Sequence, residues 1–321
     1  MVKTNIFITG ATGFVGSALV KRLSQADASI SAAVLAGENA KQFSPEIRKF
    51  TVEPLSGSSD YTTAMRGADI VIHLAARVHI MKDTASDPLS EFRKVNMYGT
   101  ERLARQAAEA GVKRFVFMST IGVNGNASGS RPFTETDDPI PHNPYSVSKL
   151  EAELALRKIC ETTGMQVVIV RAPLIYGPGN PGNFLSLLRI TSKGFPLPFA
   201  SVSNRKSFLY VENLADALAC CATHPNAAGR TFLISDGDDV STPDLIRLLA
   251  AGMGKTSCLF PFPLALMRFA GKVLGKSNEM GQLLGSLQVD SSKIRRELGW
   301  VPPFTMAQGF EKTAVWFKNA R

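Results

Sequence analysis

The sequence predicts an α/β protein with a doubly wound parallel sheet and a smaller α/β lobe toward the C-terminus. Short apolar runs rich in β-branched residues alternate with segments of helical spacing through the first half of the 321-residue chain. A glycine-rich turn follows the first of these runs, and beyond Pro173 the pattern gives way to shorter elements between Gly- and Pro-rich turns. Strands that alternate with helices need crossover connections, and therefore form a parallel sheet with helices on both faces.

The first strand is expected at 5–9, and the apolar residues that follow it share one side of a helix at 14–25. The remaining elements of the first half follow by the same reasoning. Further strands are expected at 30–35, 50–52, 69–74, 114–118 and 167–170, and further helices at 91–110 and 145–161.

The second half of the chain is expected to be shared between two lobes. Residues 176–182 are dense in Gly and Pro, which is typical of turns and marks the start of the smaller lobe. The helical pattern at 211–221 is instead expected to belong to the first lobe. The expected division is a first domain at 1–175 to which about 207–235 return, and a second lobe formed by 176–206 and 236–321.

The composition is that of a globular protein, with 45% hydrophobic and 20% charged residues. No apolar run approaches the roughly 20 residues that a membrane span needs. The longest candidate, 260–274, contains Arg268 and Lys272 and is typical of an amphipathic helix after a turn. The four cysteines lack metal-binding spacing and no export signal precedes them, so we expect reduced thiols, a cytoplasmic location and no metal site.

The formal charge of +9 is compatible with two interpretations. It would attract an anionic substrate, but it also fits an ordinary solvated surface. No block of five like charges occurs, and no basic stripe with interleaved aromatic residues is present. Neither nucleic acid nor a membrane is therefore expected as a partner.

The turn after the first strand carries three glycines in a GxxGxxG arrangement, at Gly10, Gly13 and Gly16. The first glycine permits a tight turn, the second lets the backbone approach a pyrophosphate, and the third lets the helix pack closely on the strand. The N-terminus of the following helix would face the anion. This context predicts a dinucleotide-binding loop at 10–16.

Tyr145 and Lys149 are four residues apart in a predicted helix, so both would face the same cleft. A free tyrosine has a pKa of about 10 and is a poor base at neutral pH. A nearby ammonium and a bound cationic nicotinamide would both favour the phenolate, which makes Tyr145 a candidate general acid/base. On its own this spacing is common on helix surfaces, and it gains meaning from the glycine loop upstream.

Ser119 and Thr120 stand at the expected C-terminal end of a strand, the edge at which open α/β sheets bind ligands. Together with the glycine spacing and the Tyr–Lys pair, this order of motifs resembles the extended short-chain dehydrogenases/reductases, which have a Rossmann-type fold. Within them the chain resembles the NAD-dependent epimerase/dehydratase family, which includes UDP-glucose 4-epimerases. The resemblance covers roughly residues 5–317 and implies a catalytic triad of Thr120, Tyr145 and Lys149.

The resemblance also implies which residues hold the cofactor. They are Gly10, Thr12, Gly13, Phe14, Val15, Gly16, Leu74, Ala75, Ala76, Asn96, Ser119, Tyr145, Lys149 and Pro173. Ala36 and Gly37 occupy the positions that usually distinguish NAD from NADP, so neither the acidic nor the basic determinant is evident there. We expect NAD or NADP, with NAD favoured and Glu38 as a candidate to contact the ribose.

In this family the tyrosine takes the proton of the sugar 4-hydroxyl while hydride leaves C4. A 4,6-dehydratase also uses an Asp-Glu pair directly after the Thr, and here Ile121 and Gly122 follow instead. The expected activity is therefore nucleotide-sugar C4 epimerisation, on a UDP-hexose or UDP-N-acetylhexosamine. A 4-keto reductase of a UDP-2-acetamido-6-deoxyhexose in polysaccharide biosynthesis is the alternative, and a non-catalytic dinucleotide sensor is a third.

Substrate contacts are expected from both lobes. The candidates are Arg77, Thr120, Asn124, Asn183, Arg205 and Lys206. Asn183 opens a helix after a Gly-Pro-rich turn, and the family's phosphate-binding arginine aligns with Lys206, beside Arg205. The resemblance further implies a homodimer, in which the helices at 91–110 and 145–161 pair across a two-fold axis.

Overall fold

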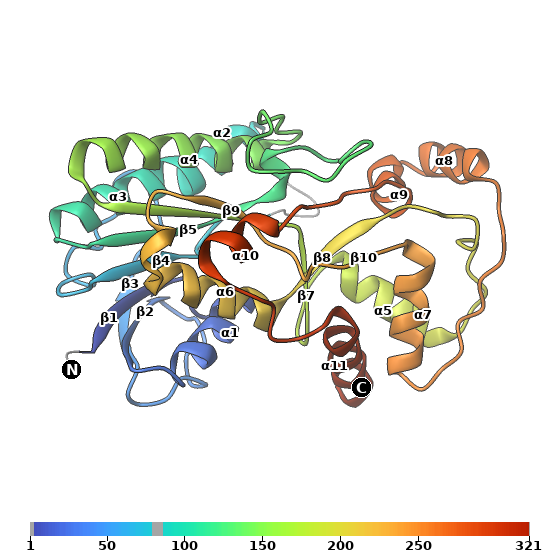
Figure 1. Cartoon of the computed structure of the whole chain (residues 1–321), viewed down its shortest axis with the longest axis horizontal. Helices are drawn as coiled ribbons and strands as arrows, with labels where there is room; N and C mark the ends of the chain where they lie inside the picture. The colour runs from blue at the N-terminus through green and yellow to red at the C-terminus, as the bar shows by residue number, and fades with distance from the viewer. Residues whose placement is uncertain (1–2, 79–85, 321) are drawn as a thin grey trace.

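The structure is a computed structural model that describes residues 3–78 and 86–320, except for the side chains of Asn183 and Asn278. A seven-stranded sheet lies between two layers of helices, and a smaller lobe adjoins one end (Figure 1). The strand order is β3-β2-β1-β4-β5-β6-β9, and all neighbouring strands are parallel. The order reverses direction between β1 and β4, as in a doubly wound Rossmann-type fold. The predicted fold class is confirmed.

The central strands of this sheet are buried on both faces, which explains why their sequences are continuous apolar runs. The six strands predicted from the sequence are all present, with ends displaced by at most two residues. The short edge strand β9 adds a seventh. Their bounds are β1 (Thr4–Thr9), β2 (Ala28–Leu35), β3 (Arg48–Val52), β4 (Ile70–His73), β5 (Arg114–Thr120), β6 (Gln166–Ala172) and β9 (Thr231–Leu233).

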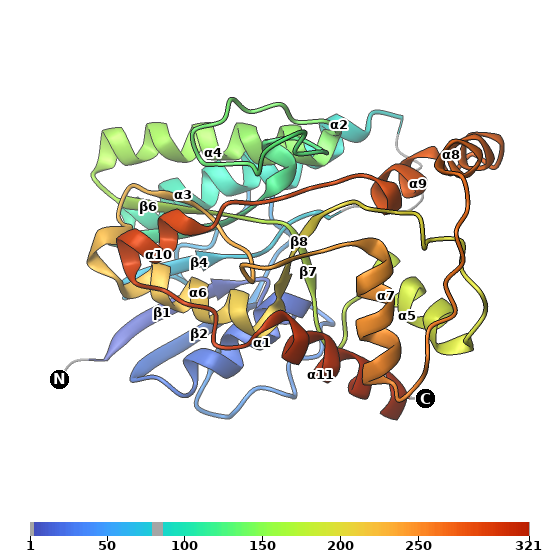
Figure 2. The same ribbon diagram turned by 45° about the vertical axis from the view of Figure 1, so that its right-hand side comes forward.

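Two layers of helices cover this sheet (Figures 1 and 2). One layer contains α2 (Pro88–Arg93), α3 (Thr100–Glu109) and α4 (Pro144–Thr163). The other contains α1 (Phe14–Leu23), α6 (Val211–Thr223) and α10 (Ser292–Leu298). Each layer encloses its own apolar cluster against the strands, so both faces of the sheet are dry.

The predicted helix at 91–110 is present but is not a uniform α-helix. Helix α2 runs into a wide π-helical stretch at Lys94–Gly99, which continues directly into α3. A π turn inserts an extra residue into the helix and is frequent at functional sites. The hydrophobic spacing of the sequence does not signal it, yet this turn positions Asn96.

The smaller lobe is built on a three-stranded sheet of β7 (Leu174–Tyr176), β8 (Lys206–Tyr210) and β10 (Asp239–Val240). Its helices are α5 (Asn183–Lys193), α7 (Thr242–Gly252), α8 (Leu264–Val273), α9 (Ser277–Leu284) and α11 (Met306–Asn319). Within 207–235, which we expected to return to the first domain, α6 and β9 lie with the large sheet. Strand β8 does not, because it pairs with β7.

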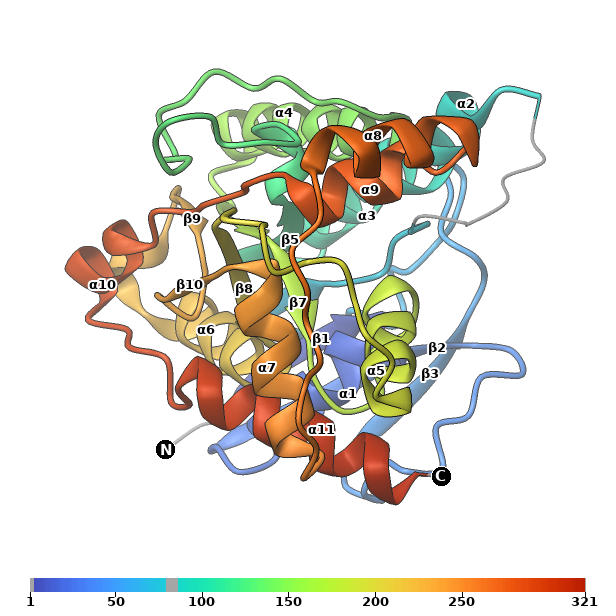
Figure 3. The ribbon, with the colours of Figure 1, turned by 90° about the vertical axis from the view of Figure 1, so that its right-hand side faces the viewer.

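A buried carboxylate holds the junction between the lobes. Asp236 accepts hydrogen bonds from the Tyr176 hydroxyl at 2.9 Å, the Tyr210 amide at 2.9 Å and the Asn213 side chain at 2.8 Å. The Tyr176 ring packs on Phe310 of α11, with centroids 4.2 Å apart. Figure 3 shows α11 running beneath α7 at this junction. The hydroxyl that bonds Asp236 therefore also fixes the distance at which α11 can pack.

Gly309 is the residue of α11 that permits this close approach. A Cβ at Gly309 would lie 2.4 Å from the Tyr176 hydroxyl and 3.0 Å from the Tyr210 ring. We expect Gly309→Ala to lower the free energy of unfolding by about 1–3 kcal/mol, as overpacking does. Gly281→Ala in α9 is the matched control, because its Cβ meets open space and alanine favours a helix by up to about 1 kcal/mol. Urea unfolding of both variants tests this, and equal stability would contradict it.

Candidate active site

A cavity of about 1310 Å³ follows the carboxyl edge of the large sheet and extends between the lobes. It begins at the ends of β1 and β2, passes the end of β5, and reaches β8 and the residues after α9. Typical pockets for one small ligand have volumes of about 300–1,000 Å³. This cavity is therefore large enough for two ligands placed end to end.

The glycine loop forms one wall of the cavity, and its geometry requires glycine. Gly10 has a φ of 68°, and a Cβ there would lie 2.7 Å from the amide nitrogen of Ala75. A Cβ on Gly16 would lie 2.1 Å from the carbonyl oxygen of Gly10. Gly13 precedes α1 and has no side chain to cap it, so the first amides of the helix are available to an anion. The loop fits a pyrophosphate.

Most of the residues expected to hold the cofactor line this part of the cavity. They are Gly10, Thr12, Gly13, Phe14, Val15, Gly16, Leu74, Ala75, Ala76, Tyr145 and Pro173. Their shape and the exposed helix N-terminus fit a dinucleotide that spans from the end of β2 to the end of β5.

The end of the cavity beside β2 favours NAD over NADP. Glu38 lines it together with Leu35, Asn39 and Gln42. The Glu38 carboxylate accepts a hydrogen bond from the Leu35 amide at 2.9 Å, which holds it at the strand end. A carboxylate can accept a hydrogen bond from a ribose 2′-hydroxyl and repels a 2′-phosphate. Glu38 thus supplies, one residue late, the charge that Ala36 and Gly37 lack.

Tyr145 and Lys149 come from the first turns of α4, with different environments. The Asn143 side chain caps the helix by accepting from the Ser146 amide at 2.8 Å. Tyr145 lines the cavity, whereas Lys149 is 2% exposed and lies behind it, with its ammonium 4.1 Å from the centre of the Phe117 ring. Burial raises the pKa of Tyr145 to about 12. Burial also lowers the pKa of Lys149 to about 7, and the nearby Glu153 carboxylate opposes that shift.

Thr120 and Ser119 end β5 and point to opposite sides, as successive strand residues do. Thr120 lines the cavity, and its hydroxyl accepts a hydrogen bond from the Gly122 amide at 3.1 Å. Ser119 is 2% exposed and donates to the Glu153 carboxylate at 2.5 Å. The direct cofactor contact expected of Ser119 is therefore not supported, because its hydroxyl faces the protein interior.

Asn96 acts on the cavity from behind its wall. Its amide side chain accepts from the Arg77 amide at 2.8 Å and donates to the Arg77 carbonyl at 3.0 Å. It also donates to the Ser148 hydroxyl at 3.0 Å, which connects the segment after β4 to α4. Arg77 lines the cavity, with its guanidinium 5.4 Å from the centre of the Phe92 ring. Asn96 is thus placed to brace the backbone that carries Arg77.

Asn124, expected to contact substrate, is placed elsewhere by the structure. Its side chain is buried, accepts from Arg171 at 3.0 Å and donates to the Thr134 carbonyl at 3.0 Å. Asn124 is not among the described residues that line the cavity. A substrate contact at Asn124 is therefore corrected to an internal contact, because both its polar atoms already have protein partners.

The other substrate candidates lie near the opposite end of the cavity. Lys206 lines it and donates to the Gln282 carbonyl, and burial lowers the pKa of Lys206 to about 8. Arg205 is exposed and is not among the described lining residues, so Lys206 is the better-placed cation. Asn183 begins α5 as expected, and its side chain lies outside the described atoms.

The structure also brings residues to the cavity that sequence reasoning did not select. They include His142, Asn126, Asn180, Ser207, Gln282 and Ser286. His142 stands three residues before Tyr145, and that spacing was a signal that could have found it. Gln282 and Ser286 carry no motif, and only the tertiary fold brings α9 and its C-terminal end to this wall.

No helix within 3–78 and 86–320 is both long and apolar enough to cross a membrane. Over the same residues, no group of three or more His, Cys, Asp or Glu side chains could hold a metal ion.

Together, the parallel sheet, the glycine loop and the Tyr–Lys pair beside a strand-end Thr define a nicotinamide-dependent enzyme of the short-chain dehydrogenase/reductase type. The sequence model of the NAD dependent epimerase/dehydratase family matches residues 6–235. The chain belongs to this family, which confirms the expected family and cofactor.

Characterised relatives agree with this placement. The UDP-glucose 4-epimerase of Vibrio cholerae is 41% identical over 319 residues, covering 98% of this chain and 96% of that protein. A UDP-glucose 4-epimerase of Thermotoga maritima, solved with UDP-glucose, has a TM-score of 0.79 at 21% identity and covers 99% of both chains. The UDP-glucuronic acid 4-epimerase of Bacillus cereus, solved with NAD, has the same TM-score at 20% identity and covers 99% of both chains. At these identities the two structures establish a shared fold.

Because Lys149 is buried, we expect it to destabilise the ligand-free protein. The unfolded chain holds the Lys149 proton up to the ordinary pKa of 10.5, whereas the folded protein holds it only to about 7. The free energy of unfolding therefore rises between about pH 7 and pH 10.5, because the cost of deprotonating Lys149 on folding decreases as the pH rises. We expect Lys149→Met to raise the free energy of unfolding at pH 7, on the order of 4 kcal/mol, and this stabilisation to shrink toward about pH 10.

Urea unfolding of the wild type and Lys149→Met at several pH values measures this difference. Lys158→Met, at an exposed position of the same helix, is the control for loss of a lysine. A Lys149→Met protein that is less stable than wild type at pH 7 would contradict the predicted penalty.

Proposed function

We infer that this NAD-dependent enzyme is a nucleotide-sugar C4 epimerase, with a UDP-hexose or UDP-N-acetylhexosamine as substrate. The observation that carries this inference is the cavity itself. Thr120 and Tyr145 line it between the glycine loop on one side and Lys206 on the other. A sugar placed at Thr120 and Tyr145 would have a dinucleotide on one side and a cation for its diphosphate on the other. The 41% identical relative is an epimerase of this substrate class.

The residues of the chain have separate roles in the proposed reaction. Thr120 donates a hydrogen bond to the sugar 4-oxygen, and the Tyr145 phenolate removes its proton. The residues of the glycine loop would hold NAD, whose nicotinamide would supply reversible hydride transfer at C4. When the 4-keto sugar presents its other face, Tyr145 gives the proton back to the same oxygen, so protons and electrons balance within one cycle. Buried Lys149, one turn behind Tyr145, favours the phenolate when it is protonated.

The wall beside Thr120 argues against a dehydratase. Elimination of the 6-hydroxyl needs groups that transfer protons next to the sugar. Ile121 and Gly122 stand where a dehydratase would have its Asp-Glu pair; His142 also lines the cavity, but Glu38, at the distant β2 end, is the only carboxylate among the described lining residues. A 4-keto reductase would use the same triad but would consume reduced cofactor. The relatives do not favour it, and the retained triad argues against a non-catalytic sensor.

The substrate diphosphate is proposed to lie between Lys206 and the N-terminus of α5, with Arg77 nearer the sugar. Lys206 is a point charge and cannot form the two parallel bonds that an arginine would give. Asn180 and Pro181 line the cavity just before α5. Asn183 remains a proposed diphosphate contact, and Arg205 is at most an electrostatic aid from outside. We further propose a cytoplasmic role in bacterial surface-polysaccharide biosynthesis.

Tyr145→Phe tests the proposed acid/base role. We expect the rate of UDP-galactose to UDP-glucose conversion to fall by about 10²–10⁴-fold, because the phenylalanine cannot exchange the proton. Cofactor content, measured on the denatured protein, should stay near the wild-type level. Tyr98→Phe, at an exposed tyrosine of the π turn, is the matched control.

The outcomes separate the candidate activities. Wild-type rates in Tyr145→Phe would refute the role of Tyr145. Stoichiometric oxidation of added NADH with a 4-keto sugar nucleotide, and no interconversion of C4 epimers, would replace the epimerase with a reductase.

We propose a homodimer in which α3 and α4 pair across a two-fold axis. Tyr98, in the π turn that leads into α3, and Leu154, on α4, are 49% and 51% exposed in the isolated chain. Exposed apolar groups on two adjacent helices favour burial against a second copy.

Leu154→Glu is expected to convert the dimer to a monomer in light scattering, because it would bury a charge at the two-fold interface. Val315→Glu, at a 43% exposed position of α11 outside the proposed interface, should leave the dimer intact. A wild-type monomer at micromolar concentration would refute the dimer.

A further inference from the structure

Helix α8 has an apolar surface that the fold leaves uncovered. Leu266, Phe269 and Val273 are 53%, 66% and 68% exposed. They are spaced i, i+3 and i+7, and Ala270 completes the pattern, so they form one stripe along the helix. Leu274, at the end of the helix, is 71% exposed and extends the stripe. Scattered exposed apolar residues are normal, whereas an aligned stripe marks an interaction surface.

This stripe is not the face by which α8 is held to the protein. Met267 and Gly271 are the buried residues of α8, and Met267 packs with Leu284 of α9 in a small apolar cluster. A Cβ at Gly271 would lie 2.9 Å from the Met280 side chain, so α8 and α9 are in close contact there. Helical spacing places the exposed stripe roughly opposite this buried face. Helix α8 thus has one apolar side for the fold and another for a partner.

Basic residues flank the stripe. Arg268 and Lys272 lie one turn apart on α8, both exposed, and Lys276 follows in the turn before α9. Residues 256–278 contain these three basic residues and no acidic residue. Leu, Phe and Val on one face with Arg and Lys beside them is the pattern of a helix that lies in the interface of an anionic lipid layer. The charge of the stripe's surroundings is complementary to lipid phosphates.

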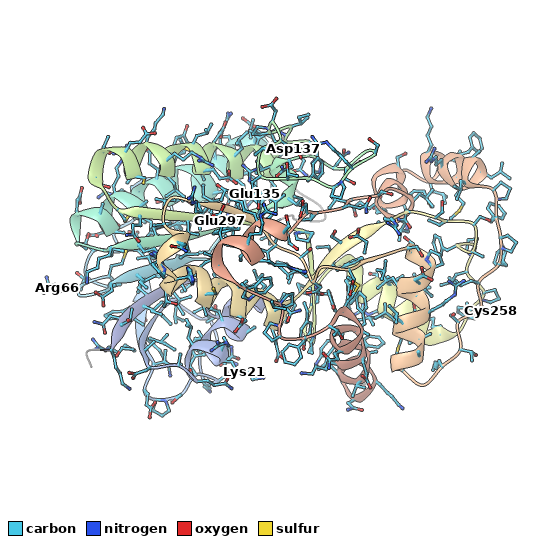
Figure 4. The ribbon with its side chains drawn as sticks, in the orientation of Figure 1. Lys21, Arg66, Glu135, Asp137, Cys258 and Glu297 are labelled. Carbon is cyan, nitrogen blue, oxygen red and sulfur yellow. The ribbon has the colours of Figure 1, made fainter. Side chains whose placement is uncertain are left out.

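The location of α8 makes this face accessible. Figures 1 and 2 show α8 at the outer edge of the small lobe, away from the large sheet. Cys258, labelled in Figure 4, lies on the same outer side, in the segment that leads into α8. Helix α9, which packs against α8, contributes Gly281 and Gln282 to the wall of the cavity. A surface bound to α8 would therefore lie near the substrate end of the site.

We propose that α8 docks the protein on the surface of an anionic lipid bilayer. The Leu266–Phe269–Val273 stripe enters the headgroup region, and Arg268, Lys272 and Lys276 pair with lipid phosphates. Ten residues of helix span about 15 Å, half of the hydrocarbon core, so α8 lies on the membrane and does not cross it. This docking goes beyond the proposed epimerase reaction and does not depend on it.

Vesicle flotation of the full-length protein tests the proposal. The wild type should float with vesicles of phosphatidylcholine and phosphatidylglycerol, and should bind vesicles of phosphatidylcholine alone about tenfold less. Phe269→Ser/Val273→Ser and Arg268→Gln/Lys272→Gln should each lower partitioning into the anionic vesicles about tenfold or more. Val301→Ser is the matched control, since Val301 is as exposed as Val273 but lies outside α8.

Each result decides the proposal. All variants should keep the wild-type thermal midpoint and rate in solution, because α8 carries none of the proposed catalytic residues. Equal partitioning of the wild type and the α8 variants, or no flotation with any vesicle, would overturn membrane docking. A smaller particle in light scattering for Phe269→Ser/Val273→Ser without lipid would show that α8 binds a second copy instead.

Discussion

The buried ion pair between Glu153 and Arg171 is the interaction on which the geometry of the site depends. Arg171 of β6 donates two hydrogen bonds to Glu153 of α4, at 3.0 and 2.6 Å, and both side chains are at most 5% exposed. Ser119 donates to the same carboxylate, and Arg171 also donates to Asn124. Two strand ends, a helix and the following loop therefore share one charge pair. Such a pair is not strong evidence of net stability, but loss of one partner typically costs about 3–5 kcal/mol.

The same carboxylate also acts on the catalytic pair. Glu153 follows Lys149 by one helical turn, and its charge raises the pKa of Lys149 against the effect of burial. Burial opposes charge on both members of the Tyr145–Lys149 pair, so in the ligand-free site the proton stays on the phenol. A positive charge in the cavity would lower the pKa of Tyr145 and so favour the phenolate. Deprotonation of Tyr145 is thus coupled to the binding of a positively charged group in the cavity.

The sequence was sufficient for the sheet, the glycine loop and the Tyr–Lys spacing, because each is a local pattern with a fixed geometric meaning. The sequence was not sufficient where tertiary contacts decide which way a side chain points. Ser119 and Thr120 alternate in a strand, but which of the two faces the cavity is decided by tertiary packing, in which Ser119 bonds buried Glu153. Asn124 was misassigned for the same reason, since Arg171 is distant in sequence. The π turn at Asn96 and the arrival of Gln282 at the cavity leave no trace in the hydrophobic spacing.

Helices α10 and α11 pack on different lobes, and their late position in the sequence affects how the chain folds during its synthesis. Ile294 and Leu298 of α10 enter the core beneath the large sheet, whereas Phe310 and Phe317 of α11 enter the core of the small lobe. Neither core is complete until residues 292–317 have been translated. Nascent chains would therefore expose apolar surface in both lobes until this segment is synthesised. A chain truncated before residue 292 would leave the cores of both lobes partly open and would be susceptible to proteolysis.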